Sequence, residues 1–138
     1  MRIILLLLCV ISPSAISGVD LDPYISNVVT FGKWEEKDKS GQIRFITKTY
    51  GSEHVYSKLF IQWLTYHEDG VVDSKVVSET SVKELNEKYY SFGSPVCVGD
   101  WKCQSFELRA TDAFSYTNHK FIITLQGIGL YTIVEKAL

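Results

Sequence analysis

Polar and apolar side chains alternate along most of this sequence, which is the pattern of β-strands that bury one face. Residues 105–110, Ser-Phe-Glu-Leu-Arg-Ala, show the alternation without error. Helical periodicity is nearly absent, so the sequence predicts an all-β fold. We expect an antiparallel β-sandwich of about seven or eight short strands, immunoglobulin-like or similar, with a small β-barrel as the alternative. Six further stretches are rich in β-branched and aromatic residues, namely 28–34, 43–50, 55–66, 71–77, 121–125 and 130–134.

A helical signal is found in residues 81–88. Ser81 followed by Glu84 fits a capping box, in which the two side chains cap the first turn of a helix. A polar loop is the alternative for this stretch. Further along, residues 129–133, Gly-Leu-Tyr-Thr-Ile, resemble the Gly-x-Tyr strand entry of many sandwich domains, including immunoglobulin-like ones. This resemblance bears on architecture and implies no particular function.

The first residues have the layout of a secretory signal peptide. Arg2 precedes nine apolar residues at 3–11, which as a helix would rise only about 13–14 Å, less than half of a bilayer core. Small residues follow at the positions that a signal peptidase reads. We therefore predict a signal peptide over residues 1–17, cleaved after Ser17 or Gly18, and a single β domain over residues 18–138. The protein is expected to be secreted or periplasmic.

After this cleavage, Cys97 and Cys103 are the only cysteines left. An even pair in an exported protein predicts a disulfide. If Gly99, Asp100 and Trp101 form a three-residue loop, the two cysteines stand directly opposite each other across a hairpin, within bonding distance. The bond would then fix the hairpin and hold Trp101 at its tip.

Turn sequences predict the register of the central strands. A three-residue loop at 51–53 places Ile43 opposite Ile61 and builds an apolar face from odd-numbered residues. A register one residue away would mix charged side chains into that face, which burial forbids. The Asp-Gly pair that follows suits a two-residue turn and places Val76 opposite Trp63 on the same inner side.

The even-numbered face of the same strands combines cations with aromatic rings. The predicted register puts Arg44 beside Phe60 and Lys48 beside Tyr56, which permits cation–π contacts. Aromatic and arginine side chains are enriched at recognition surfaces, so this face is a candidate for partner binding. The alternative is that lysine and arginine stems cover the rings, or that a loop or helix covers the patch, and it has no partner. The candidate residues are Arg44, Lys48, Tyr50, Tyr56, Lys58, Phe60, Gln62 and Tyr66.

The sequence lacks the motifs of common enzyme classes. It contains no Gly-x-Ser-x-Gly string, no phosphate loop and no dinucleotide fingerprint. His54, His67 and His119 do not have the spacing that would bring two imidazoles to one metal ion, and we expect them in loops or at strand ends. The sequence therefore predicts no catalytic residue, no metal site and no cofactor.

Composition reduces the number of possible functional classes further. A net charge of −2 does not favour nucleic acid or an anionic membrane, and 46% hydrophobic residues exclude a disordered chain. We expect an exported non-enzymatic binding or accessory module that recognises a protein or glycan partner at the cell envelope or outside the cell, with no membrane span in the mature chain. One alternative is an enzyme inhibitor that uses the tip at 99–101 as a rigid wedge. The other is a small hydrolase in which a histidine meets a carboxylate in a cleft.

Overall fold

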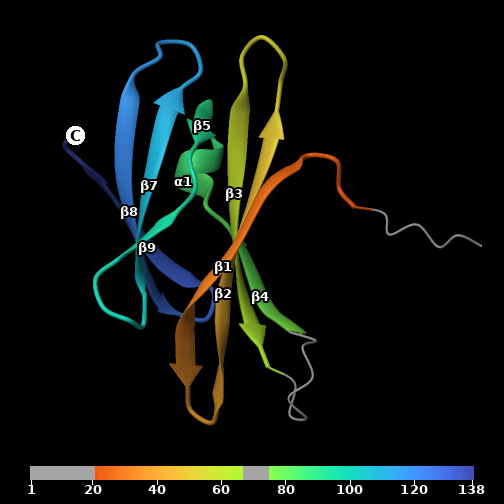
Figure 1. The fold of residues 1–138 in the computed structure, drawn as a ribbon, viewed down its shortest axis with the longest axis vertical. Helices are drawn as coiled ribbons and strands as arrows, with labels where there is room; N and C mark the ends of the chain where they lie inside the picture. Colours follow the sequence, from red (N-terminus) through yellow and green to blue (C-terminus); the bar gives the residue numbers. More distant parts are fainter. Residues whose placement is uncertain (1–20, 67–74) are drawn as a thin grey trace, which may run out of the picture.

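The structure, a computed structural model, describes residues 21–66 and 75–138 (Figure 1). The signal peptide predicted over residues 1–17 lies outside the described residues, as do His67, the Asp-Gly turn at 69–70 and the start of the stretch 71–77. The described ranges contain one helix, α1 (Lys83–Asn86), and nine strands: β1 (Ile25–Glu36), β2 (Lys39–Tyr50), β3 (Tyr56–Thr65), β4 (Lys75–Ser81), β5 (Tyr90–Phe92), β6 (Val96–Val98), β7 (Ser105–Asp112), β8 (Asn118–Gly127) and β9 (Leu130–Lys136).

The strands form two antiparallel sheets, which confirms the predicted β-sandwich and not the barrel. The first sheet has the order β1-β2-β3-β4 and the second has the order β5-β7-β8-β9, with β6 also paired to β7. Strands that follow each other in sequence are therefore mostly neighbours in space. Immunoglobulin domains instead exchange strands between their sheets through Greek-key connections. Figure 1 shows the two layers side by side, with α1 close to β3.

The β2–β3 hairpin has the predicted parity but not the predicted register. Tyr50 pairs with Tyr56, so the loop has five residues, and Ile43 lies opposite Trp63 instead of Ile61. Because the side-chain period of a strand is two, a shift of two residues leaves every side chain on its predicted face. The odd-numbered side chains that point inward and are buried are Ile43, Phe45, Thr47, Ser57, Leu59, Ile61 and Trp63.

The pairing predicted between β3 and β4 is wrong by one residue next to the connection, and a bulge in β4 adds a second residue of shift. Trp63 lies opposite Ser78 and Leu64 lies opposite Val76, with the irregularity between them. Val76 is 41% exposed rather than packed on the inner side. The extra residue, Val77, leaves two residues of β4 facing one of β3, and such an insertion shifts every pair beyond it.

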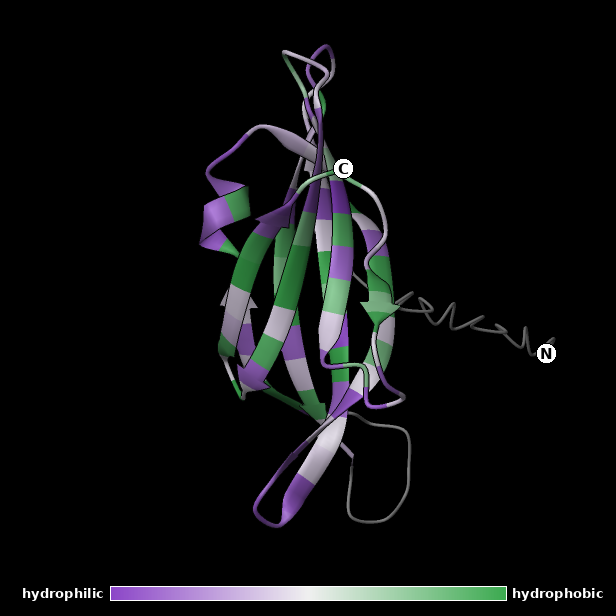
Figure 2. Ribbon diagram, turned by 90° about the vertical axis from the view of Figure 1, so that its left-hand side faces the viewer, coloured by the Kyte–Doolittle hydropathy of each residue, from purple (hydrophilic) through white to green (hydrophobic). Residues whose placement is uncertain are grey.

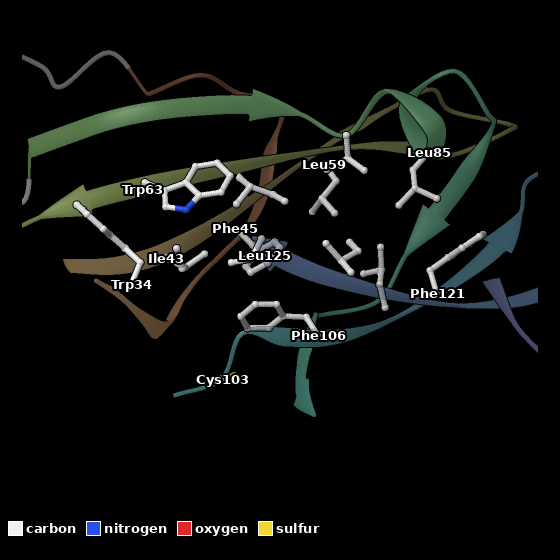
Figure 3. Packing of buried hydrophobic residues seen from close by; sticks show 14 of the residues in the cluster. Trp34, Ile43, Phe45, Leu59, Trp63, Leu85, Cys103, Phe106, Phe121 and Leu125 are labelled. Carbon is white, nitrogen blue, oxygen red and sulfur yellow. The ribbon is translucent and has the colours of Figure 1, made fainter. Parts of the chain in front are cut away.

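The hydrophobic core fills the space between the sheets (Figure 3). Phe45 from the first sheet and Phe106 from the second meet edge to face, with ring centroids 4.7 Å apart, an arrangement that aromatic pairs favour. The alternation read in residues 105–110 is confirmed, because Phe106, Leu108 and Ala110 are buried. Figure 2 shows the same alternation as changes of hydropathy along the strands.

Trp34 joins β1 to β3 across β2 at one end of the core. Its indole Nε1 donates a hydrogen bond of 2.9 Å to the backbone oxygen of Leu64. This contact passes over Gly41 of the intervening strand, where a Cβ atom would lie 1.6 Å from the same oxygen. Any side chain at Gly41 would therefore displace the indole. Figure 3 shows Trp34 and Trp63 together at this end of the core.

The single turn of α1 lacks the predicted capping box. Val82 is its N-cap and no side chain caps it, while Ser81 is the last residue of β4. The helix is held by Asn86 instead: its Oδ1 accepts from the Leu59 N–H at 2.7 Å, and its Nδ2 donates to the Leu59 oxygen at 2.8 Å. Together with the Val82 N–H, which also donates to the Leu59 oxygen at 3.1 Å, the Asn86 amide continues the pairing of β3 beyond the end of β4.

We expect Asn86→Ala to lower the free energy of unfolding by about 1–3 kcal/mol, because it leaves the buried Leu59 amide without its partner. Urea denaturation followed by circular dichroism measures this. The control is Glu87→Ala, which removes an exposed neighbour and should change stability by no more than about 0.5 kcal/mol. Equal midpoints for the two variants would contradict the role given to Asn86.

Candidate functional site

The predicted binding residues lie on the outer side of the first sheet, on β2 and β3. Tyr66 is separate, because it follows the end of β3 opposite to Tyr56 and is exposed there. Gln62 is only 8% exposed, and the others are half-buried. We call the following seven residues the aromatic–basic face: Arg44, Lys48, Tyr50, Tyr56, Lys58, Phe60 and Gln62.

A row of polar side chains crosses three strands of this face. Arg44 lies opposite Gln62 rather than opposite Phe60 as predicted. Its Nε donates to Gln62 Oε1 at 2.8 Å, and Gln62 Nε2 in turn donates to Glu79 Oε2 on β4. The chain of contacts explains how Gln62 is buried on an outer face, because its amide is satisfied from both sides. It also fixes the position of the Arg44 guanidinium.

Two lysines on the face lie against aromatic rings, although not the pairs that were predicted. Lys48 lies opposite Lys58 rather than Tyr56. Lys48 Nζ is 5.2 Å from the centre of the Phe60 ring, and Lys58 Nζ is 5.6 Å from that of Tyr50. These diagonal contacts arise from the shift of register, and both distances are within the range of cation–π attraction.

Lys48 is also held by an ion pair with Asp22, at 2.6 Å. The hydrogen bond from Lys48 holds the pKa of the Asp22 carboxyl below its usual value, and the same contact raises the pKa of Lys48. Both groups stay charged around neutral pH. No local sequence pattern indicates this pair, because Asp22 precedes β1 and meets β2 only through the fold.

An aromatic row continues from the face across the end of the sandwich that lies at the top of Figure 1. Tyr50 stacks between Tyr24 and Tyr56, with ring centroids 4.7 and 5.6 Å away. The row then passes through Tyr89 to Phe114, at 5.2 Å for each step. Four separate segments contribute these rings, so the row could not be read from sequence spacing.

The predicted disulfide between Cys97 and Cys103 is confirmed, with a Cα–Cα distance of 5.5 Å. The hairpin predicted around it is wrong. Cys97 pairs with Phe106 across β6 and β7, so the loop is longer than three residues, and Cys103 lies buried within it at a positive φ of 53°. Gly99, Asp100 and Trp101 do form the exposed part of this loop, and Trp101 is 73% exposed.

His54 and His119 both have partners in the structure. His54 Nδ1 lies 3.2 Å from the backbone oxygen of Ala113 and joins the β2–β3 and β7–β8 loops. His119 Nδ1 lies 2.8 Å from Glu135 Oε1, and its Nε2 lies 3.1 Å from Thr117 Oγ1. The His119 group could not be predicted from the sequence, because it depends on the pairing of β8 with β9.

A small cavity of about 170 Å³ lies between α1 and the second sheet. Glu135 and Glu84 stand on its wall, and Leu85 and Phe121 contribute apolar surface. Glu84 Oε2 accepts a 2.6 Å hydrogen bond from the Tyr131 hydroxyl. Burial and this carboxylate raise the pKa of Tyr131 to about 12, so the tyrosine remains a donor throughout the physiological range.

Comparison with known protein families, curated proteins and solved structures finds no match for this chain. Within residues 21–66 and 75–138, no three His, Cys, Asp or Glu side chains are grouped so that they would hold a metal ion. In the same ranges no helix is long and apolar enough to span a membrane.

We expect the double variant Cys97→Ser/Cys103→Ser to fold and to lose about 2 kcal/mol of unfolding free energy, because the closed ring is short. The local effect should be larger: β6 has only three residues, so Trp101 gains mobility, measured as lower fluorescence anisotropy and stronger acrylamide quenching. A reducing agent should reproduce both effects in the wild type and leave the double variant unchanged. Unaltered quenching after reduction would show that the bond does not hold the loop.

Proposed function

We propose that this protein is an exported, non-enzymatic module that binds a macromolecular partner through the aromatic–basic face. The partner is a protein or glycan at the cell envelope or outside the cell. The predicted signal sequence and the disulfide support export, since disulfides persist in oxidising compartments.

The observation that carries the proposal is the fixed geometry of the cations on this face. Arg44 is anchored by Gln62, Lys48 by Asp22, and both Lys48 and Lys58 lie over aromatic rings. Side chains that are ordered before binding lose less conformational entropy when a partner arrives. A solvent face without a partner gains little from such ordering, because exposed ion pairs contribute little to stability.

The composition of the face favours a protein with acidic side chains as the partner. Arginine and tyrosine are the residues that most often dominate binding energy in protein interfaces. The face has three cations and two neighbouring carboxylates: Asp22 pairs with Lys48, and Glu79 accepts a hydrogen bond from Gln62. An acidic partner would therefore find complementary charge, which raises association rate and selectivity.

The test is affinity capture from the native envelope or medium with the oxidised mature domain. We expect the triple variant Arg44→Ser/Lys48→Ser/Lys58→Ser to bind the captured partner at least about tenfold more weakly than the wild type. Raising the salt concentration should weaken wild-type binding, because the contact is electrostatic.

The second sheet offers a matched control for this experiment. Arg109, Lys120 and Lys136 form a row of paired residues across β7, β8 and β9. Changing all three to serine removes the same charge from the other outer face. Both triple variants must remain folded by circular dichroism. If they lose affinity equally, the interaction depends on total charge and the proposed face is wrong.

The Thr117–His119–Glu135 group is the observation that favours a hydrolase as the second candidate. With the His119 proton on Nδ1, the imidazole donates to Glu135, and its Nε2 accepts from the Thr117 hydroxyl. This is the order of groups by which serine hydrolases activate a nucleophilic hydroxyl. The binding function remains the better supported, because Thr117 lies in an exposed turn and also hydrogen bonds to Ser115.

The two candidates give different results with a p-nitrophenyl ester. A binding module predicts the same slow hydrolysis for the wild type, His119→Gln and Thr117→Val. A hydrolase predicts that both variants lose the activity, while Thr111→Val on the neighbouring strand retains it. The second result would replace the binding function with catalysis.

A further inference from the structure

The end of the sandwich opposite the aromatic row, at the bottom of Figure 1, has a groove lined by residues of β1, β3 and β8. A hollow of about 340 Å³ has Trp34, Trp63 and Leu125 among its lining residues, with Gln104 and Gln126 beside them. A second hollow of about 310 Å³ shares Trp34 and Gln126 with the first and follows the β8–β9 turn. We call the two together the mouth groove. It lies at the strand ends, away from the aromatic–basic face.

Trp101 is linked to this groove through Lys33. The Lys33 N–H donates to the backbone oxygen of Lys102 at 3.0 Å, which joins the disulfide loop to β1. Lys33 also lines the groove, and its Nζ is 5.4 Å from the centre of the Trp101 ring. All three tryptophans of the sequence therefore gather at this end, two buried beneath the groove and one exposed beside it.

The loop that carries Trp101 is held in place from several sides. The disulfide joins it to β6, and the Cys103 N–H donates to the Asp100 oxygen at 3.1 Å. Gly32 of β1 has a φ of +78°, and a Cβ there would lie 2.7 Å from the Cys103 oxygen. Only glycine permits so close a contact between β1 and the loop. The backbone of the loop is therefore fixed before any ligand binds, and it holds the exposed Trp101 at this end of the sandwich.

The polar groups on the rim define the kind of ligand. Gln104, Gln126 and Glu35 are exposed along the groove. An amide both donates and accepts hydrogen bonds, which matches hydroxyl groups, since they also do both. A membrane surface is disfavoured, because the carboxylates of Glu35 and Glu36 would repel anionic lipid head groups.

We propose that the mouth groove binds a saccharide chain. One sugar ring stacks its C–H face on the Trp101 indole, and the following units place their hydroxyls against Gln104, Gln126 and Glu35. The ammonium groups of Lys33 and Lys102, which lie over the Trp101 ring in the free protein, move aside for the sugar and donate hydrogen bonds to it. This site is independent of the proposed function, because it uses neither the residues nor the sheet face assigned to the macromolecular partner.

The test is isothermal titration of the oxidised mature domain with three soluble oligosaccharides: β-1,4-linked glucose, β-1,4-linked N-acetylglucosamine and oligogalacturonate. We expect at least one to bind with a millimolar or lower Kd. Trp101→Ala should weaken that binding about tenfold, and Trp101→Phe, which keeps an aromatic face, only about threefold. Gln104→Ala/Gln126→Ala should weaken it by about tenfold without unfolding the domain.

The matched control is Tyr116→Ala, which removes an aromatic ring that is 71% exposed in the β7–β8 loop. It should leave the Kd within about twofold of the wild type. The triple variant of the aromatic–basic face should also bind the oligosaccharide like the wild type. Failure of the saccharide site can therefore be distinguished from failure of the proposed partner-binding face.

Two results would overturn the saccharide site. One is the absence of binding by the neutral, N-acetylated and acidic oligosaccharides at millimolar concentration. The other is binding that survives in Trp101→Ala. A protein whose capture is lost in Trp101→Ala, with no oligosaccharide bound, would identify the loop as a wedge for a protein cleft.

Discussion

The central constraint in this domain is that every side chain of β2 and β3 points either into the core or to the outer side of the first sheet. A slip of one residue in either strand would bury a lysine or arginine and expose side chains such as Phe45 or Leu59. Burying an unpaired charge costs several kcal/mol, and exposing a large apolar side chain loses about 1.5–3 kcal/mol. The core therefore fixes the parity of these strands firmly. Because the core takes the odd-numbered side, the cations and rings of the other side must remain accessible.

The sequence predicts to which face each side chain of β2 and β3 points. It does not predict which residues pair across the two strands. The alternation in 105–110 and in β2 and β3 identified the strands and their buried faces correctly. A slip of two residues leaves every side chain on the same face, so only the length of the loop decides the register. The loop after Tyr50 has five residues instead of the predicted three. The bulge at Val77 could not be predicted either. Val76 and Val77 are identical neighbours on a partly exposed strand, so the sequence does not show which of them points inward.

The candidate sites show the same division between local and long-range information. The Cys97–Cys103 bond and the exposure of Trp101 follow from short spacing, and the even-numbered residues of the face follow from parity. The contacts that give each site its chemistry join distant segments: Asp22 with Lys48, His119 with Glu135, and Lys33 with Lys102. These depend on sheet order and on how the edges of the two sheets meet, which no local pattern encodes.

Loops and side chains cover the two ends of the sandwich differently, and this difference determines where a ligand fits. At the upper end, the edge-to-face contact of Tyr56 with Tyr89 and the His54–Ala113 contact join segments from both sheets. At the lower end, Trp34 and Trp63 cover the core, and the groove that they line remains open. The disulfide lies at this open end, where so short a ring adds only about 2 kcal/mol to global stability. Its local effect is larger, because it acts with the Lys33–Lys102 hydrogen bond to fix the loop that carries Trp101. A strong local restraint on an exposed indole beside a polar groove is the arrangement expected of a binding site, whereas a bond serving stability alone would close a longer loop.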